Sequence, residues 1–420
     1  MKKSLQIMIA ICIVVLMPIN VYAQVDNEAK YEITTNEITN WPKGPEILAD
    51  TGVLIESTTA EVLYDKGMNE KRYPASITKV MTALLAVENA SMDEQLVFSA
   101  SALEGMYLGT NIGMLEGEVL TMEQCLKALM IRSANEVANQ IAEHIGGTQA
   151  EFANMMNERA AEIGCQNTNF ANASGMPDDN HYSTAYDMAL IFREALKNEQ
   201  FRSLFDTVDF TIAPTNMNPE ERYIHSNHHM FVTTVPQHYE GVIGGKTGTT
   251  DVSGSTLVTA VERDGIDFIA VVMRTGDHLH CCEDTTKLFD YGYDNFEKIN
   301  VAEGDLLAPK EATEADFEVV DVEDGNMVKR TYSYNGHLLG TMESEKIEPT
   351  EAPVLSEQPS IEEVNPSEEI QQQEAQQGIP TSLLLRRIIV VMSGLIIVGL
   401  LLIIIIAIRK KIRRKKGKRQ

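Results

Sequence analysis

Basic residues are scarce over most of this chain. Of its 420 residues, 61 are Asp or Glu and 35 are Lys or Arg. The two ends, residues 1–23 and 386–420, hold no acidic residue, so residues 24–385 combine 22 basic with 61 acidic side chains, a formal charge of −39. Phosphate backbones bind proteins through Lys and Arg and repel a body this acidic. The charge distribution therefore excludes nucleic acid as a partner.

Cysteine is also rare. Beyond the N-terminal apolar run there are four: Cys125, Cys165, Cys281 and Cys282. Outside the cell an even number permits disulfides without specifying them. The adjacent pair Cys281-Cys282 would be strained if bonded to itself, and beside His278 and His280 it can also bind a metal, although the spacing matches no recognised zinc pattern. We expect a polar loop here and no metal site.

The N-terminus has the features of a secretory signal. A basic start is followed by an apolar core from Ile7 to Pro18 and by the small residue Ala23, the order found in cleaved export signals. We expect a signal peptide over residues 1–23 with cleavage before Gln24. The alternative is a retained N-terminal membrane helix, for which the apolar core is short.

The C-terminus contains the longest apolar run. Ile388 to Ile408 is 21 residues without a charge, and as a helix it would be about 31 Å long, enough to cross a bilayer. Residues 409–420 are strongly basic, and basic flanks stay on the cytoplasmic side. The sequence predicts a single-pass protein of the cell membrane with an extracytoplasmic body. The alternative is a buried helix of a soluble fold.

An acidic spacer precedes this run. Residues 349–380 contain no aromatic residue and no Lys or Arg, and they are crowded with Glu, Gln, Pro and Ser. Such a composition cannot form a packed core, so we predict a disordered linker. As a flexible coil it would span roughly 30 Å, which would hold the folded part away from the membrane.

Strand patterns occur at both ends of the folded part. The apolar runs 53–55 and 61–64 flank a polar turn and predict a hairpin, and 255–261 and 266–273 predict a second one. Strands from both ends can share one sheet with helices packed on it. Residues 304–348 contain two further strand-like runs and predict a small β module.

The middle of the chain is predicted to be helical. After Pro74, apolar residues from Val80 to Val87 repeat at helical spacing. Thr121 and Thr148 each begin a capping box, and the run that follows Thr148 ends at Gly164. Helices therefore separate the two strand-rich parts.

The first chemical motif is Ser76-Ile77-Thr78-Lys79. On a helix, residues three apart share a face, so the Ser hydroxyl and the Lys amine can meet at the helix N-terminus. Apolar neighbours can desolvate the amine, lower its pKa and let it act as a base. The alternative is a helix cap beside a surface lysine, because a lone Ser-x-x-Lys is a weak signal.

Two further motifs follow. Ser133-Ala134-Asn135 offers a hydroxyl and an amide on a turn, although by itself it also fits a helix-cap serine. In Lys246-Thr247-Gly248, after Gly244-Gly245, glycines allow an extended backbone to approach a ligand closely, and Lys and Thr can hold a carboxylate. Alone it fits any glycine-rich turn, but the spacing of a phosphate-binding loop is missing.

In this order, and in an exported protein, the three motifs are the signature set of the penicillin-recognising serine enzymes. Within that group the chain resembles the low-molecular-mass D-alanyl-D-alanine carboxypeptidases, serine peptidases that trim peptidoglycan stems. The resemblance covers about residues 45–300. The matching stretches are Pro74–Thr82, Arg132–Asn135, Asn172–Pro177, His181–Ala185 and Gly244–Gly248.

The resemblance implies an α+β fold, a five-stranded antiparallel sheet with a helical cluster and the site between them. It also implies roles. Ser76 would attack the carbonyl of the penultimate D-Ala and form an acyl-enzyme, with Lys79 as its base, and the backbone N–H groups of Ser76 and Thr249 would form the oxyanion hole. Ser133 would relay a proton to the leaving amine. The remaining substrate-binding residues would be Asn135, Lys246, Thr247, Gly248 and Thr249. No cofactor or metal is implied.

The expected partners are peptidoglycan stem peptides, β-lactam antibiotics as inhibitors, and the membrane through one C-terminal span. The family usually has a larger β domain and a surface-lying amphipathic helix at this end, so the role of residues 304–348 stays open. We divide the chain into a signal peptide (1–23), an N-terminal segment (24–44), a catalytic domain (45–303), a small β module (304–348), a disordered linker (349–380), a transmembrane helix (388–408) and a basic cytoplasmic tail (409–420).

Other functions remain open at this stage. One is a serine β-lactamase, and another is a non-catalytic penicillin or peptidoglycan-binding protein. Class A β-lactamases hydrolyse the penicilloyl ester with a carboxylate between the second and third motifs. Between Asn135 and Lys246 there is no Glu-x-x-Leu-Asn. The sequence therefore favours the carboxypeptidase.

Overall fold

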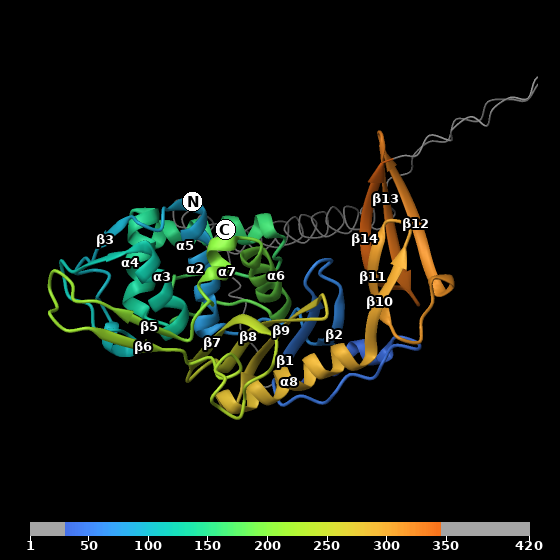
Figure 1. Cartoon of the computed structure of the whole chain (residues 1–420), viewed down its shortest axis with the longest axis horizontal. Coiled ribbons are helices and arrows are strands. Elements are labelled where there is room, and N and C mark those ends of the chain that lie inside the picture. The colour runs from blue at the N-terminus through green and yellow to red at the C-terminus, as the bar shows by residue number, and fades with distance from the viewer. Residues whose placement is uncertain (1–29, 346–420) are drawn as a thin grey trace, which may run out of the picture. The chain divides into compact units, whose positions relative to one another are not determined.

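The main sheet has five antiparallel strands in the order β2-β1-β9-β8-β7 (Figure 1). It belongs to a computed structural model that describes residues 30–345. β1 pairs with both β2 and β9, so the N-terminal hairpin joins the C-terminal one, and the predicted shared sheet is confirmed. The strands are β1 (Thr51–Glu56), β2 (Val62–Lys66), β7 (Val242–Thr250), β8 (Gly254–Arg263) and β9 (Ile266–Thr275).

Both faces of this sheet are covered by apolar side chains. In β1, Val53 and Ile55 pack into the core under the helical cluster, whereas Leu54 packs into a second core on the other face. This alternation is the two-residue period of a strand. All six residues of β1 are buried, which explains why its sequence reads as a continuous run.

Helices cover both sides of the sheet. The first core unites β1, β8 and β9 with α2, α3, α4, α5, α6 and α7, and the second packs α8 against the opposite face (Figure 1). The expected α+β architecture is confirmed. The helices are α2 (Lys79–Asn89), α3 (Met122–Lys127), α4 (Asn135–Gly146), α5 (Gln149–Ile163), α6 (Ala185–Leu196), α7 (Glu199–Ser203) and α8 (His278–Asn295).

Local signals placed several helix ends correctly. Thr121 makes both hydrogen bonds of its capping box with Gln124 at the start of α3. The Thr148 side chain accepts from the amide of Glu151 at the start of α5, and Gly164 ends that helix in the left-handed region. These side chains satisfy backbone groups that a helix terminus leaves without partners.

The expectation of a polar loop at His278–Cys282 was wrong, because these residues form the first turn of α8. The Asp277 side chain caps that helix by accepting from the amide of His280 at 2.9 Å. Cys281 and Cys282 face the second core and are buried. The four cysteines of the described region are free thiols.

Residues beyond α8 form two small antiparallel sheets. The sequence predicted two of their strands, β12 and β13, and missed the others. The second core extends into them through Trp41, whose ring centroid lies 5.2 Å from that of Phe296 and 6.4 Å from that of Tyr334. The boundary at residue 304 stays a prediction. The strands are β10 (Phe296–Val301), β11 (Gly304–Pro309), β12 (Phe317–Asp324), β13 (Met327–Tyr334) and β14 (His337–Glu345).

Two short ribbons extend the helical part. β3 (Gln95–Val97) pairs with β4 (Val119–Thr121), and β5 (Asp209–Ile212) pairs with β6 (Arg222–His225). Both lie on the same side of Figure 1 as α3 and α4. The loop between β3 and β4 includes Thr110, whose carbonyl accepts from the amide of Asn135.

Several predicted segments lie outside the described residues: the signal peptide, the acidic linker, the transmembrane helix and the basic tail. Between residues 30 and 345, no helix is both long enough and apolar enough to cross a bilayer.

Candidate active site

Ser76 lies on a short 3₁₀ turn, η2 (Ala75–Thr78), that leads into α2. Residues three apart are eclipsed on such a turn, and the Lys79 Nζ donates to Ser76 Oγ at 3.0 Å. Ala75 has a φ of 51°, in the left-handed region that costs a residue with a Cβ roughly 1–3 kcal/mol. Backbone strain thus lies beside a half-buried hydroxyl.

Lys79 is held by three acceptors. Besides Ser76, its Nζ donates to Asn135 Oδ1 at 2.7 Å and to the Ser174 carbonyl at 2.5 Å. The side chain is fully buried, so the alternative of a surface lysine is excluded. Burial, followed by the charge of Lys246, holds its pKa well below the usual range of a lysine, while Glu136 opposes this shift. Such an amine is suited to accept a proton.

The second motif lies where a π-helical turn, η4 (Ala128–Arg132), ends and α4 begins. Ser133 is in the left-handed region with a φ of 68°. Its Oγ is buried and has no hydrogen-bond partner within the described part of the chain. Asn135 begins α4, and its side-chain oxygen accepts from Lys79. The Asn135 oxygen is therefore already engaged, whereas the Ser133 hydroxyl is available to a ligand.

The third motif lies on β7, an edge strand of the sheet. Lys246 is 1% exposed, and burial lowers its pKa to about 7. Its Nζ donates to the Thr247 carbonyl at 2.9 Å, and Thr247 Oγ1 donates to Asn227 Oδ1 at 3.1 Å. The motif is therefore an extended strand and no phosphate-binding turn.

Gly248 brings this strand against Ser76. A Cβ at Gly248 would lie 2.8 Å from the amide nitrogen of Ser76 and 2.4 Å from Thr256 Oγ1. Thr256 in turn donates to the Pro74 carbonyl at 2.9 Å, which ties β8 to the turn that carries Ser76. A side chain at position 248 would separate the first and third motifs.

The structure adds contacts that we did not assign from the sequence. The segment Asn172–Pro177 supplies the Ser174 carbonyl to Lys79, and Asn172 Oδ1 fixes this bend by accepting from the amides of Ser174, Gly175 and Met176. A Cβ at Gly175 would lie 1.9 Å from the Ala75 carbonyl oxygen. An Asn followed closely by Gly indicates a turn, but nothing local indicates which carbonyl faces the lysine.

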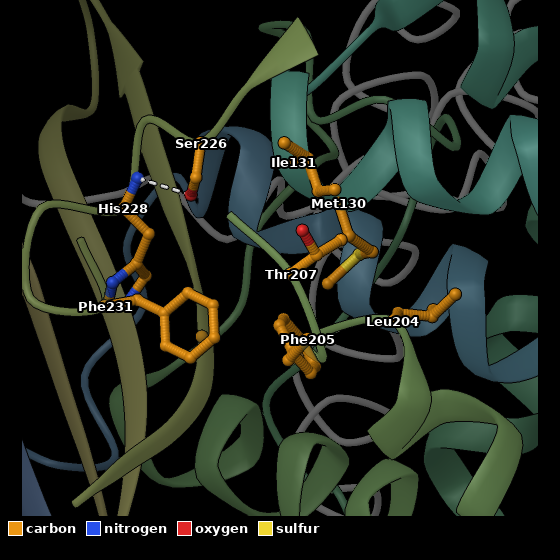
Figure 2. Close-up of a pocket in the computed structure, with 9 residues that line it drawn as sticks. Met130, Ile131, Leu204, Phe205, Thr207, Ser226, His228 and Phe231 are labelled. Carbon is orange, nitrogen blue, oxygen red and sulfur yellow. Dashed lines mark hydrogen bonds between the residues drawn. The ribbon is translucent and has the colours of Figure 1, made fainter. Parts of the chain in front are cut away.

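A small cavity is lined by residues from several segments, among them Gly245 of β7 (Figure 2). It approaches the second motif through Ile131 and the third through Gly245, against which the His228 ring is packed. It contains none of the predicted catalytic residues. Its lining is Met130, Ile131, Leu204, Phe205, Thr207, Ser226, His228, Phe231 and Gly245.

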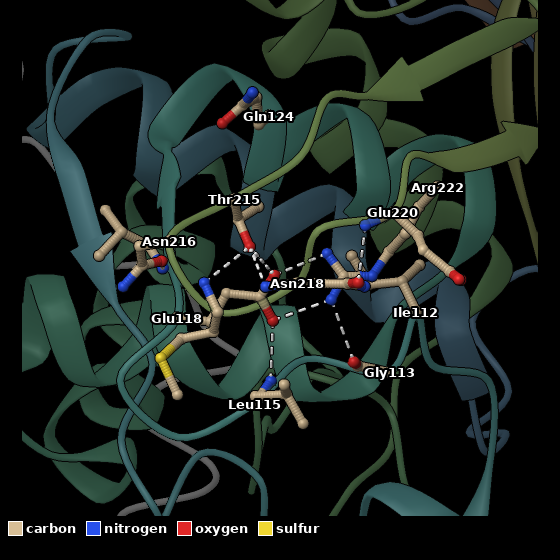
Figure 3. A network of polar contacts seen from close by, with 12 residues as sticks. Ile112, Gly113, Leu115, Glu118, Gln124, Thr215, Asn216, Asn218, Glu220 and Arg222 are labelled. Atoms are coloured by element: carbon tan, nitrogen blue, oxygen red, sulfur yellow. Dashed lines mark hydrogen bonds and ion pairs between the residues drawn. The ribbon is translucent and has the colours of Figure 1, made fainter.

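An ion pair between a buried carboxylate and a partly buried guanidinium fixes the loop that borders the second motif (Figure 3). Arg222 on β6 makes two parallel hydrogen bonds to the Glu118 carboxylate, at 2.7 and 2.8 Å, and a longer one to the Gly113 carbonyl. Thr215 and the amide of Leu115 complete the shell of Glu118. The same loop meets the site where the Thr110 carbonyl accepts from the amide of Asn135 at 2.8 Å.

The described residues form no candidate metal site. Among residues 30–345, no group of three or more His, Cys, Asp or Glu side chains is arranged to hold an ion. His278 and Cys282, weighed above as ligands, lie one helical turn apart with 3.8 Å between Nε2 and Sγ.

Comparison with known proteins agrees with this geometry. Residues 38–276, more than half of the chain, match the D-alanyl-D-alanine carboxypeptidase family, peptidase family S11. The D-alanyl-D-alanine carboxypeptidase DacF of Bacillus subtilis is 33% identical over 254 residues, covering 59% of this chain and 63% of that protein. DacB2 of Mycobacterium tuberculosis is 30% identical over 260 residues, covering 60% of this chain and 84% of that protein.

A solved structure extends the likeness to the fold. The crystal structure of a D-alanyl-D-alanine carboxypeptidase from Mycobacterium tuberculosis superposes with a TM-score of 0.56 at 27% identity, over 61% of this chain and 95% of that one. The aligned part spans less than two thirds of the Bacillus protein. The family and enzyme class predicted from the three motifs are confirmed: this chain belongs to the S11 family of serine D-alanyl-D-alanine carboxypeptidases.

Proposed function

We propose that the protein removes the terminal D-Ala from peptidoglycan stem pentapeptides and acts in cell-wall maturation. The observation that carries this proposal is the contact between a fully buried lysine amine and a half-buried serine hydroxyl, 3.0 Å apart. A buried amine with a lowered pKa can be neutral at a pH where an exposed lysine is still charged. It can therefore activate the serine.

Acylation is the first proposed step. Ser76 Oγ attacks the carbonyl carbon of the penultimate D-Ala while Lys79 Nζ takes the hydroxyl proton. The backbone N–H groups of Ser76 and Thr249 stabilise the negative oxygen of the tetrahedral intermediate. The close approach of Gly248 to the Ser76 amide supports this assignment, because it places β7, which carries Thr249, next to the turn that carries Ser76.

The leaving group is the terminal D-Ala. As the C–N bond breaks, Ser133 Oγ gives its proton to the departing amine and takes in its place the proton that Lys79 received from Ser76. The Ser133 hydroxyl has no other partner in the described region, which leaves it free to act as this relay. Lys246 and Thr247 hold the terminal carboxylate, and Asn135 binds the peptide of the substrate. Water then hydrolyses the ester and returns Ser76.

Penicillin would enter the same path and stop after acylation. Between the second and third motifs there is no Glu-x-x-Leu-Asn of the kind that activates water in class A β-lactamases. The look-alike Glu194–Asn198 has the wrong spacing, and Glu194 is on α6 in ion pairs with Arg159 and Lys197. A long-lived penicilloyl-enzyme therefore fits better than a β-lactamase.

In this proposal the catalytic domain acts outside the cell, and one C-terminal membrane span over residues 388–408 anchors it. The support is the charge-free apolar run and the basic tail after it. Ending the chain at Pro380 should release an active enzyme into the soluble fraction. If the truncated protein stays with the membrane, the N-terminal signal segment is a second anchor.

Covalent labelling tests the proposed nucleophile. A fluorescent penicillin should attach to the full-length protein, and peptide mass mapping should place the adduct on Ser76. Ser76→Ala should abolish the label, whereas Ser174→Ala, a nearby serine whose carbonyl alone contacts Lys79, should keep it. A label on another serine, or unchanged labelling of Ser76→Ala, would contradict the mechanism.

A further inference from the structure

His181 is a buried histidine beside the proposed site that the mechanism above does not use. It lies in the loop before α6 and is 1% exposed. Its Nδ1 accepts from the amide of Ala171 at 3.0 Å, and its Nε2 lies 2.8 Å from Oγ1 of Thr78. Both ring nitrogens are therefore engaged, and they contact two segments that are far apart in the sequence.

The contact with Ala171 fixes which ring nitrogen carries the proton. A backbone amide can only donate, so Nδ1 must be an unprotonated acceptor. The neutral ring then carries its proton on Nε2 and donates it to Thr78. Burial lowers the pKa of His181 to about 4, against the effect of Asp178 and together with that of Lys79. The ring is therefore neutral near pH 7, and both hydrogen bonds persist there.

The two partners of the ring belong to two segments that hold the lysine amine. Thr78 lies directly before Lys79 on η2, the turn that also carries the serine nucleophile. Ala171 leads into the bend whose carbonyl, at Ser174, accepts from Lys79 Nζ at 2.5 Å. His181 thus joins the segments that carry two of the three acceptors of this amine.

We propose that His181 is a positioning residue for acylation, whose neutral ring ties the turn of Ser76 to the bend of Ser174 and so fixes the Lys79 amine against the serine hydroxyl. This inference rests on the proposed attack by Ser76. A displacement of about 1 Å at a reacting group can cost about a hundredfold in rate. Without the tie the Ser174 carbonyl can shift relative to the turn, and the amine that it holds shifts with it.

Asn157 on α5 provides a matched control. Its side chain makes two hydrogen bonds to the backbone of Phe170, at 2.7 and 2.9 Å, one residue before Ala171. It therefore fixes the same loop, but to α5 instead of η2. Asn157→Ala removes two hydrogen bonds from this loop and leaves the tie between His181 and Thr78 in place.

The experiment measures penicillin labelling of Ser76 on the full-length protein and separates the acylation rate at saturation from the half-saturating concentration. His181→Asn keeps an acceptor for Ala171 and removes the donor to Thr78. The acylation rate should fall at least about tenfold. The half-saturating concentration should stay within about twofold of the wild-type value, because the third motif, which holds the carboxylate, is untouched. A loss of folded protein alone would change neither constant.

Thr78→Val removes the same hydrogen bond from its other end. It should slow acylation to a similar extent, and the double variant should be no slower than either single variant, because both changes break one contact. Asn157→Ala should acylate at close to the wild-type rate. Urea unfolding of each variant shows that it is folded.

An unchanged acylation rate in His181→Asn would overturn the inference, and so would an equal loss in Asn157→Ala or additive losses in the double variant. If His181→Asn does not fold, Thr78→Val decides by the same criterion. Absence of label on Ser76 in the wild type would instead refute the proposed function itself. The two failures are thus distinguishable.

Discussion

The charge of Lys246 on β7 lowers the pKa of Lys79 on α2, although the two residues are 167 positions apart in the sequence. Both amines are buried, and their proposed tasks require different protonation states. Lys79 must be neutral to accept a proton, and Lys246 must be charged to attract a carboxylate. A protonated Lys246 favours the neutral form of Lys79, so the two requirements support each other.

This relationship predicts a bell-shaped pH dependence of kcat/KM for the pentapeptide. The acid limb reports the loss of a proton from Lys79. The alkaline limb should lie near pH 7, because burial lowers the pKa of Lys246 to about 7 and its attraction for the carboxylate is lost as pH rises through that value. A pentapeptide with an amidated C-terminus is the control and should show no alkaline limb at that position. An identical limb with the amidated peptide would assign it to another group.

Gly248→Ala should slow acylation strongly without unfolding the protein. The new methyl would lie 2.8 Å from the Ser76 amide nitrogen and 2.4 Å from Thr256 Oγ1, so β7 must retreat from the nucleophile. We expect penicillin labelling to fall at least about a hundredfold, the typical effect of losing one oxyanion-hole donor. Gly276→Ala, whose methyl meets its nearest neighbour at 3.7 Å, should label normally. Normal labelling of Gly248→Ala would remove the argument for this close approach.

Asn227→Ala should weaken substrate binding. Asn227 is not part of any of the three motifs, but Thr247 Oγ1 lies 3.1 Å from its Oδ1. Losing one hydrogen bond of about 0.5–1.5 kcal/mol predicts a KM for the pentapeptide that rises about two- to tenfold with little change in kcat. In the background of Thr247→Val the same substitution should have no further effect. Additive effects of the two substitutions would show that Asn227 acts elsewhere.

Arg222→Met should destabilise the fold strongly. It leaves the fully buried carboxylate of Glu118 without its charged partner, a change that costs about 3–5 kcal/mol in other buried pairs. Urea unfolding followed by circular dichroism measures this loss. Lys329→Met, which breaks the exposed pair with Glu343, should cost at most about 1 kcal/mol. Equal losses in the two variants would contradict the structural role of the Glu118–Arg222 pair.

Much of the site could be predicted because its parts are local. Ser76 and Lys79 are one turn apart, and Gly244-Gly245 indicate a segment that a ligand or another part of the chain can approach closely. The partner contacts could not be predicted. The Ser174 carbonyl and Asn227 reach the site through loops whose course depends on tertiary packing, and their own sequence neighbours carry no signal for it.

The fold shows the same division. β1, β2, β8 and β9 have strong apolar runs bounded by turns, and the sequence predicted all four. α8 was missed because its first turn is rich in His and Cys, and its buried face becomes apparent only when Cys281 and Cys282 are read as apolar residues in register with Leu288 and Phe289. β14 contains polar residues on both faces, since its sheet is partly exposed, and it lacks the alternation that identifies a half-buried strand.

The measurement that tests the central claim most directly is D-Ala release from a stem pentapeptide, compared with the fate of penicillin on the same full-length enzyme. We predict many D-Ala molecules released per enzyme molecule, inactivation by penicillin at close to one molecule per enzyme, and loss of both reactions in Ser76→Ala. Steady hydrolysis of penicillin over many turnovers with no D-Ala released would contradict the account and identify a β-lactamase instead.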